Sequence, residues 1–332
     1  MSVAVEREPK PAAGPSERPA DEPPATVAGR SDGTVAPAWL RQRERGSTFG
    51  IRFFVAAVGV LGRSVTRALL WPVVLYYVVT QPSARRASRQ WLTRVGARAR
   101  LGDVYRHLRR FAECALDRML LAQGRTDAFE VTLTGHEYLR ALASERRGAI
   151  LLGAHLGSFE AMRAQSELKG IDIHVLVNTE NARMVTAALE RLGPQALAKI
   201  VEVGQGGGLE AMLRVREIVD GGALVAILGD RLDPAGRTVE VPFFGAPARF
   251  PAGPYLLAAA LGCPVYLTFG LYRGGNRYDL FCEPFAERIV LVRGRRDAAL
   301  AEHALRYAER LEHYARLEPD NWFNFFDFWG RA

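Results

Sequence analysis

From residue 130 onward, apolar and polar positions follow two alternating patterns. Short uninterrupted apolar runs are separated by segments whose apolar residues recur at helical spacing. Continuous apolar runs are typical of strands that are buried on both faces, so the sequence predicts an α/β fold with a mostly parallel central sheet covered by helices. The expected strands are Glu130–Leu133, Ala149–Ala154, Asp172–Val177, Ala198–Val203, Leu224–Leu228, Val239–Pro242, Val265–Leu271 and Tyr278–Cys282. The expected helices are His136–Ser144, Ser158–Leu168, Arg183–Arg191, Gly208–Val219, Pro254–Ala260 and Asp297–Glu312.

The first hundred residues differ from the rest of the chain. Residues 1–36 are rich in Pro, Ala, Glu and Arg and have no hydrophobic period, which predicts a disordered tail without a signal peptide. We expect a basic and apolar helical region over residues 37–100. The α/β domain is expected over residues 101–332, opening with a helix whose apolar positions recur from Leu101 to Gln123.

Within the helical region, two apolar runs (residues 53–61 and 68–79) flank a short segment that holds Arg63 and Arg67. Neither run reaches the roughly 20 residues that a membrane-spanning helix needs. Joining them would place both arginines near the bilayer centre, at about 2.5–3.5 kcal/mol each. The segment therefore favours a helix lying in the membrane interface, bent at Pro72, with the two arginines toward lipid phosphates. The alternative is a pair of core helices with a solvated arginine face.

The overall charge narrows the classes of partner. A net charge of +8 and a pI near 9.7 indicate that the protein binds a polyanionic partner, either nucleic acid or an anionic membrane face. Because no nucleic-acid recognition motif accompanies the charge, the apolar segment favours the cytoplasmic membrane leaflet, and no nucleic acid is expected as a partner. The arginines that follow the apolar segment support this preference. The three cysteines are widely spaced, form no metal-ligand pattern and are expected to be buried thiols in a reducing compartment, so no metal site is predicted.

The clearest candidate chemistry lies in the segment from Gly153 to Glu160. His155 follows a buried apolar run, and Glu160 stands five residues later, where a helix begins. Ligands of open α/β sheets collect at the carboxyl ends of the strands. A histidine there can take a proton from a hydroxyl, while a carboxylate holds the ring and stabilises the imidazolium. The pair predicts a general base for acyl transfer to an alcohol, although Glu160 is also a residue that the helix dipole favours and His155 could be a core residue.

Ser158 raises the possibility of a serine nucleophile. The pattern Gly-x-Ser-x-Gly is absent, since Leu156 and Glu160 stand at the glycine positions. We expect Ser158 to cap the helix that follows.

A second polar block follows the strand that ends at Leu228. Asp230 and Arg231 are again expected at the carboxyl edge of the sheet, and Arg231 and Arg249 have the forked donors that bind phosphate. A surface ion pair between Asp230 and Arg231 is the alternative. Three aromatic residues near strand ends are candidates for an acyl channel or for ordinary core packing: Phe243, Phe244 and Phe250.

In this order, the blocks resemble the bacterial lipid A biosynthesis acyltransferases of the lauroyl/myristoyl-transferase type, within the lysophospholipid acyltransferase superfamily. The resemblance runs from about Trp39 to Trp329. It rests on the stretches 155–160, 229–231, 241–245 and 247–251, with a weaker match over 105–111.

This resemblance implies a glycerolipid acyltransferase-like fold and an enzyme at the cytoplasmic face of the bacterial inner membrane. It implies transfer of a fatty acyl group from acyl carrier protein, or from coenzyme A, to a hydroxyl of a lipid or glycolipid, with no further cofactor. His155 would be the base and Glu160 its partner. The substrate-binding residues would be Ser158, Asn178, Asp230, Arg231, Phe243, Phe244 and Arg249.

The polar segment that begins at Asn178 departs from the arginine- and proline-rich stretch of the family, which suggests a divergent branch. Its acceptor could be a lipid A precursor, a polyene or another glycolipid. The alternative function is a non-catalytic acyl-lipid-binding protein that keeps the fold.

Overall fold

The protein has the predicted α/β fold, with a β-sheet at its centre. The computed structural model describes residues 4–7, 26–30, 48–178, 199–203, 209–233 and 236–330. Within these, the main sheet has the strand order β1-β3-β11-β10-β4-β7-β5-β6, and the mostly parallel, helix-covered architecture is confirmed. The strands are β1 (Ala4–Arg7), β3 (Glu130–Thr134), β4 (Ala149–Gly153), β5 (Ile173–Asn178), β6 (Ile200–Val203), β7 (Leu224–Leu228), β10 (Val265–Gly274) and β11 (Arg277–Ala286).

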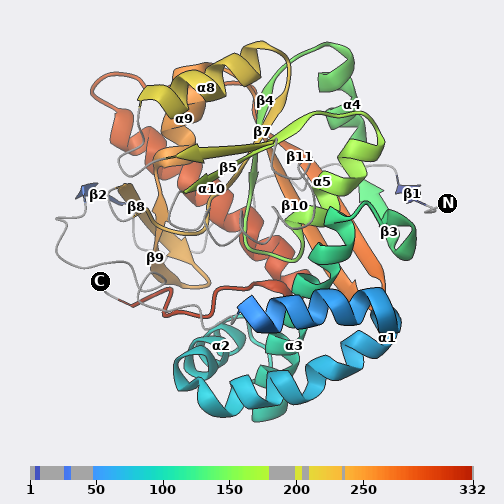
Figure 1. Cartoon of the computed structure of the whole chain (residues 1–332). Helices are drawn as coiled ribbons and strands as arrows, with labels where there is room; N and C mark the ends of the chain where they lie inside the picture. Colours follow the sequence, from blue (N-terminus) through green and yellow to red (C-terminus); the bar gives the residue numbers. More distant parts are fainter. Residues whose placement is uncertain are drawn as a thin grey trace.

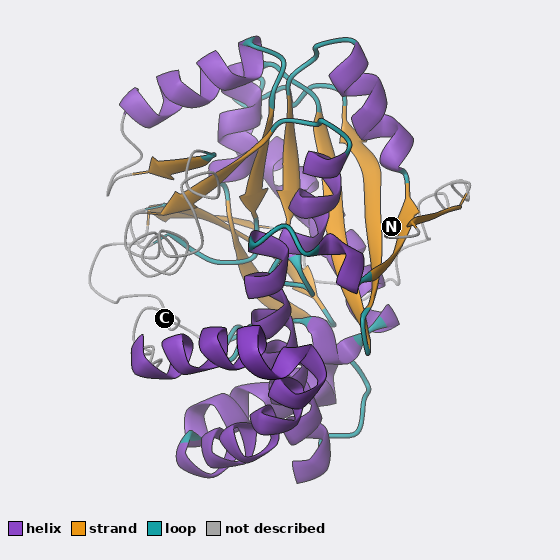
Figure 2. Ribbon diagram, turned by 45° about the vertical axis from the view of Figure 1, so that its right-hand side comes forward, coloured by secondary structure: helices purple, strands orange, loops and turns teal. Residues whose placement is uncertain are grey.

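Strand β4 lies in the middle of this sheet and shows why its residues are uniformly apolar. It pairs in parallel with β7 on one side and with β10 on the other, and all five of its residues are buried. Ile150 and Leu152 belong to the core beneath α10 (Arg296–Leu317), whereas Leu151 belongs to the core beneath α4 (His136–Ser144). Helices therefore cover both faces, and Figure 2 shows the strands lying between them. The remaining covering helices are α5 (Phe159–Leu168), α8 (Leu209–Asp220) and α9 (Gly253–Leu261).

One predicted strand belongs to a second, antiparallel sheet. The expected strand Val239–Pro242 lies in β8 (Arg237–Phe243), which pairs with β9 (Ala246–Pro251) and with β2 (Thr26–Arg30). Phe244 and Gly245 connect β8 to β9 with positive φ values of 49° and 71°. Two such residues form the turn that matches the twist of a hairpin. The sequence did not indicate β9, because two prolines interrupt its apolar pattern.

Two expectations fall wholly or partly on residues that the structure leaves undescribed. The expected helix Arg183–Arg191 lies outside the described residues. In the N-terminal tail, described strand β1 pairs with β3 and β2 pairs with β8, so the expectation of a tail without structure does not hold at these two segments.

Three N-terminal helices gather at one end of the molecule (Figure 1). They are α1 (Thr48–Thr80), α2 (Pro82–Arg94) and α3 (Leu101–Ala122). The break in α1 falls at Gly62, whose φ of 74° and ψ of 171° are not helical, whereas Pro72 lies inside the helix. Among the described helices, none combines the length and the apolar character that a membrane crossing requires.

The two arginines of α1 point into the protein, which corrects their predicted orientation toward lipid phosphates. Arg63 donates from Nε and Nη2 to the Asp117 carboxylate of α3, both at 2.7 Å, and Arg67 donates to Glu113 at 2.9 Å. Both guanidinium groups also donate to the carbonyl of Gly275, in the turn between β10 and β11. Asp117 and Glu113 are buried. The reason for the inward orientation is that two buried carboxylates of α3 need cationic partners.

Removing the Arg63 guanidinium is expected to destabilise the fold. Arg63→Met leaves the buried Asp117 carboxylate with the Tyr278 hydroxyl at 2.8 Å but without its cation. We expect a loss of about 3–5 kcal/mol in the free energy of unfolding, measured by chemical denaturation. Asp117→Asn added to Arg63→Met removes the unpaired charge and is expected to restore part of the loss.

Arg214→Met is the matched control. Arg214 is 65% exposed and pairs with the exposed Glu217 at 3.6 Å, so its loss should be below about 1 kcal/mol. Equal losses for Arg63→Met and Arg214→Met would contradict a structural role for the buried pair.

Candidate active site

His155 and Asp230 meet at the carboxyl edge of the main sheet. Strands β4 and β7 are parallel neighbours with Gly153 opposite Leu228, and each functional residue lies two positions beyond its strand. Asp230 Oδ1 lies 2.7 Å from His155 Nδ1, and Asp230 Oδ2 accepts the backbone N–H of His155 at 3.0 Å. The carboxylate therefore holds both the ring and the backbone of the histidine. When Nδ1–H donates to Asp230, Nε2 is the nitrogen that can accept a proton.

The Asp230 carboxylate is held in turn by the C-terminal segment. Its Oδ2 also accepts the indole N–H of Trp322 at 3.0 Å and the side-chain amide of Asn324 at 2.8 Å. Asp230, Trp322 and Asn324 are all at most 1% exposed. A buried carboxylate with this many donors is fully hydrogen-bonded and fixed in direction. The sequence analysis missed the two C-terminal residues, and their only signal was a tryptophan and an asparagine in an aromatic tail.

His107 supports the same segment from behind. It is fully buried on α3, with Nε2 2.9 Å from the Trp322 carbonyl and Nδ1 2.9 Å from the Ser88 hydroxyl of α2. Burial lowers the pKa of His107 to about 4, so the ring is neutral at physiological pH. Trp91 of α2 adds a ring contact with Trp322 at 4.5 Å between centroids. Helices α2 and α3 thus fix the segment that fixes Asp230.

The charge state of the pair suits a base. Burial lowers the pKa of His155 and Arg231 lowers it further, while the negative charge of Asp230 acts in the opposite direction. Burial alone would raise the pKa of Asp230, but His155 and Arg231 bring it down to about 2. At neutral pH the site therefore holds a carboxylate beside a neutral imidazole. The His155 side chain is 26% exposed, so the ring is open to a substrate.

Glu160 occupies a different place from the one predicted for it. It lies in the first turn of α5, as expected, and its carboxylate pairs with Arg118 of α3 at 2.7 Å. The carboxylate on His155 Nδ1 is that of Asp230 instead. The positive charge of Arg118 lowers the pKa of His155, though less than burial and Arg231 do. Whether Glu160 takes part in the reaction stays a prediction.

Ser158 and the two predicted phosphate-binding arginines have defined positions. Ser158 caps α5, with its hydroxyl accepting the Ala161 N–H at 3.2 Å, as predicted. Arg231 donates to the Asn324 side chain at 3.0 Å and to the Phe323 carbonyl at 3.2 Å, next to Asp230. Arg249 lies on β9, opposite Glu240 in the small sheet, and so is not brought beside His155 by its strand. Binding of phosphate by either arginine stays a prediction.

The three aromatic candidates pack in the core. Phe243 and Phe250 are fully buried and Phe244 is 8% exposed. Phe243 contacts Phe250, Trp322 and Trp329 at 5.3–5.7 Å between centroids, an aromatic cluster of the kind that stabilises a core. The structure favours the packing alternative for these rings, and an acyl channel there stays a prediction. Asn178 is described only as the last residue of β5.

Among the described residues, no group of three or more His, Cys, Asp and Glu side chains is arranged to hold a metal ion. The candidate site consists of His155 with the buried Asp230 carboxylate behind it, and the Arg118–Glu160 pair joins α3 to the first turn of α5. A histidine held in this way at the carboxyl ends of the strands has the geometry that a general base requires. The family model of the bacterial lipid A biosynthesis acyltransferases matches residues 117–330, and the chain belongs to this family.

Family membership implies acyl transfer to a lipid acceptor, and members act at the bacterial inner membrane. A comparison with curated proteins finds no match for the chain. The matched residues include His155, Glu160, Asp230 and the C-terminal segment with Trp322 and Asn324, so the candidate site lies within the part of the chain that matches the family model.

The pKa of His155 gives the first test of this site. We expect the imidazole of folded His155 to titrate below the usual histidine value of about 6.5, because burial disfavours the charged ring. Asp230→Asn removes the charge that favours the imidazolium and is expected to lower the midpoint further. NMR of ¹³C-labelled histidine, with the signal assigned from His155→Ala, measures both midpoints.

Asp327→Asn is the control for this titration. Asp327 accepts a hydrogen bond from Gln90 at the surface and is expected to leave the His155 midpoint unchanged. A wild-type midpoint above the usual value, or no change with Asp230→Asn, would contradict the proposed electrostatics.

Proposed function

We propose that the protein is a membrane-associated O-acyltransferase that moves a fatty acyl group from acyl carrier protein, or from coenzyme A, to a hydroxyl of a lipid or glycolipid. The observation that carries this proposal is the hydrogen bond between His155 Nδ1 and the buried Asp230 carboxylate. It leaves Nε2 of a neutral, partly exposed ring as a proton acceptor. The family match supports the choice of an acyl thioester and a lipid as substrates.

In the proposed mechanism, the acceptor hydroxyl gives its proton to His155 Nε2 as its oxygen attacks the thioester carbonyl. Asp230 holds the ring in the productive tautomer and stabilises the imidazolium that forms. The tetrahedral intermediate then collapses, the C–S bond breaks and the imidazolium returns its proton to the leaving thiolate. The products are an ester and a free thiol, and His155 is neutral again.

We assign stabilisation of the tetrahedral oxyanion to Arg118. Its side chain is 46% exposed, its charge lowers the pKa of His155, and Glu160 pairs with it at 2.7 Å. A well-placed donor to a developing oxyanion contributes about 3–4 kcal/mol. In this proposal Glu160 acts at the reaction centre by fixing Arg118, which gives the histidine–glutamate spacing a function other than holding the ring.

The exposed face of α1 supports a membrane site for the reaction. Arg63 and Arg67 point inward, and the adjoining side of the helix presents a stripe of exposed apolar side chains at helical spacing: Trp71, Leu75, Tyr76 and Val79, each 56–63% exposed. A contiguous apolar face of this kind marks an interaction surface. Exposed arginines of α2 lie next in the chain and favour anionic lipid at the cytoplasmic face of the inner membrane. The same arginines are candidates for docking the acidic carrier protein.

Transfer of a labelled acyl group from acyl carrier protein into a total lipid extract of the producing cell tests the reaction. We expect a labelled lipid with the wild type, a loss of about 10²–10⁴-fold with His155→Ala, and a loss of at least about 10²-fold with Asp230→Asn. Glu160→Gln is expected to lose less transfer activity than Asp230→Asn, because the Glu160 side chain does not contact His155 Nδ1. Circular dichroism checks that each variant is folded.

Equal product from His155→Ala and wild type would remove His155 as the base. No product from folded wild type with either donor class would favour a non-catalytic acyl-lipid-binding protein. A larger loss from Glu160→Gln than from Asp230→Asn would make Glu160 the more important carboxylate.

The apolar stripe of α1 predicts that replacing its residues weakens binding of the protein to membranes. Trp71→Ser combined with Leu75→Ser is expected to weaken binding to vesicles that contain phosphatidylglycerol by at least about tenfold, since each side chain loses apolar burial in the lipid. Co-sedimentation measures the binding. Leu213→Ser, at a 51% exposed position on α8, is the control and should bind like the wild type. Equal binding of all three proteins would exclude α1 as the lipid-binding surface.

A further inference from the structure

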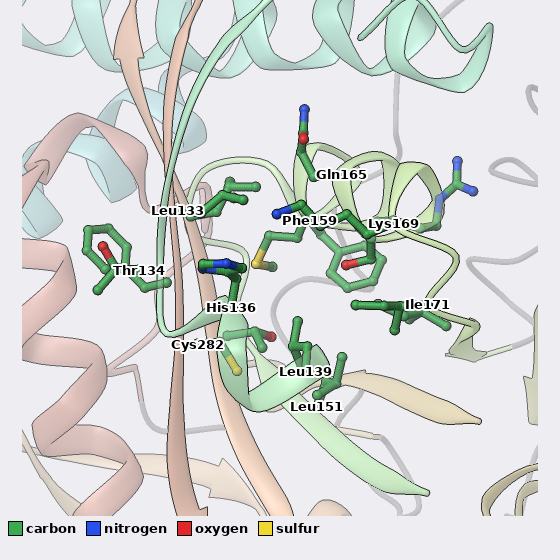
Figure 3. A pocket seen from close by; sticks show the side chains of 17 residues that line it. Leu133, Thr134, His136, Leu139, Leu151, Phe159, Gln165, Lys169, Ile171 and Cys282 are labelled. Atoms are coloured by element: carbon green, nitrogen blue, oxygen red, sulfur yellow. The ribbon is translucent and has the colours of Figure 1, made fainter. Parts of the chain in front are cut away.

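An apolar hollow beneath α5 is separate from the contacts that hold His155. Side chains such as Leu133, Leu139 and Ile171 line it (Figure 3). None of the described residues that hydrogen-bond to His155 or Asp230 lines this hollow. The contacts that control the base lie instead in the C-terminal segment that encloses Asp230.

In that segment, the side-chain amide of Asn324 lies between two charged groups. Its Oδ1 accepts a hydrogen bond from Arg231 Nε at 3.0 Å, and its Nδ2 donates to Asp230 Oδ2 at 2.8 Å. Arg231 also donates from Nη2 to the Phe323 carbonyl at 3.2 Å, which holds its guanidinium group against the backbone beside Asn324. Asn324 and Asp230 are each 1% exposed. The amide thus forms a buried bridge between a cation and an anion that are adjacent in the sequence.

The two charges determine which way the amide faces. The pKa of Asp230 is about 2, so its carboxylate is ionised at neutral pH and only accepts hydrogen bonds, whereas a guanidinium group only donates them. With the amide reversed, its N–H groups would face Arg231 and its oxygen would face Asp230. Both contacts would then be repulsive in a buried place where water does not screen them. Arg231 therefore fixes Asn324 in the orientation that donates to Asp230.

The amide also stands between Arg231 and the carboxylate that His155 uses. The positive charge of Arg231 lowers the pKa of both His155 and Asp230. A guanidinium group in direct contact with a carboxylate forms forked, charge-assisted hydrogen bonds that are roughly twice as strong as neutral ones. Such a contact would compete with His155 Nδ1 for Asp230 and would neutralise the charge that stabilises the imidazolium. His155 would then be a weaker base.

We propose that Asn324 and Arg231 form a positioning pair for the general base. Arg231 fixes the amide, the amide holds Asp230 on His155 Nδ1, and the same amide keeps the guanidinium group off the carboxylate. This inference rests on the proposed function. It gives Arg231 a part in the reaction that does not require it to bind a phosphate.

A double-mutant cycle of Asn324→Leu and Arg231→Met tests the pair. NMR gives the His155 midpoint, and transfer from dodecanoyl-loaded carrier protein at varied amounts of the total lipid extract gives kcat and an apparent KM. Asn324→Leu removes the bridge, so Arg231 is expected to pair with Asp230, and the charge it brings outweighs the loss of one neutral donor. We expect a lower His155 midpoint than in the wild type, a kcat lower by at least about tenfold, and an unchanged apparent KM.

Adding Arg231→Met to Asn324→Leu removes the competing cation. The double variant is expected to have a higher His155 midpoint than Asn324→Leu and a kcat at least about threefold above it. Arg231→Met alone also removes a cation that lowers the His155 pKa, so the midpoint should rise in both backgrounds, and more where Asn324 is absent. If Asn324→Leu does not fold, Asn324→Ser takes its place, because the serine side chain is too short to bridge the two charged groups.

Gln90→Leu is the matched control. It removes a side-chain amide that donates to Asp327 at 3.0 Å in the same C-terminal segment, and it should leave the His155 midpoint and kcat unchanged.

A lower midpoint with Asn324→Leu and its reversal by Arg231→Met would support the proposal. An unchanged midpoint with Asn324→Leu, or equal effects of Arg231→Met in both backgrounds, would overturn it while leaving acyl transfer established. A change confined to the apparent KM would also overturn it and would indicate that Arg231 binds the acceptor. If the wild type transfers no acyl group, the proposed function itself fails, and the four His155 midpoints still decide whether Asn324 and Arg231 act as a pair.

Discussion

The carboxylate of Asp230 is the point on which the arrangement of the site depends. It is fully enclosed and accepts hydrogen bonds from the backbone and ring of His155, from the indole of Trp322 and from the amide of Asn324. A buried charge is tolerated only when such donors surround it. Three segments far apart in the sequence must therefore meet there for the fold to be stable. The direction in which His155 presents its free nitrogen follows from the same requirement.

The positions of His155 and Asp230 could be predicted from the sequence, because each follows a short apolar run that marks a buried strand. The apolar runs located β4 and β7, and their ends placed His155 and Asp230 at the carboxyl edge of the sheet. The neighbour relation of β4 and β7 was not predictable, because β5 and β6 lie between them in the chain and only packing sets the strand order. Glu160 was assigned to the ring because it is near in sequence, whereas the actual partner is 75 residues away. Trp322 and Asn324 were missed for the same reason.

For the N-terminal region, the sequence predicted the helices correctly but not the direction in which Arg63 and Arg67 point. Its composition correctly indicated apolar helices rich in arginine, but a helical pattern alone does not tell which face turns inward. Buried Asp117 and Glu113 on α3 decide this, since each requires a cation. Arg63 and Arg67 turn inward to meet them, and the apolar stripe with Trp71 and Leu75 is left on the outside. The ion pairs that fix α1 thus also create its exposed apolar face.

Helix α3 connects that face to the reaction centre. One helix supplies Asp117 to hold α1, His107 to hold the Trp322 backbone and Arg118 to meet Glu160. Because these three contacts project from a single rigid rod, α1 and His155 keep a fixed separation and direction. An acceptor lipid presented at the surface that α1 contacts would then meet His155 at a constant depth. If α1 binds lipid as proposed, the N-terminal helices do more than attach the protein to the membrane, since through α3 they set the position of His155 relative to the lipid.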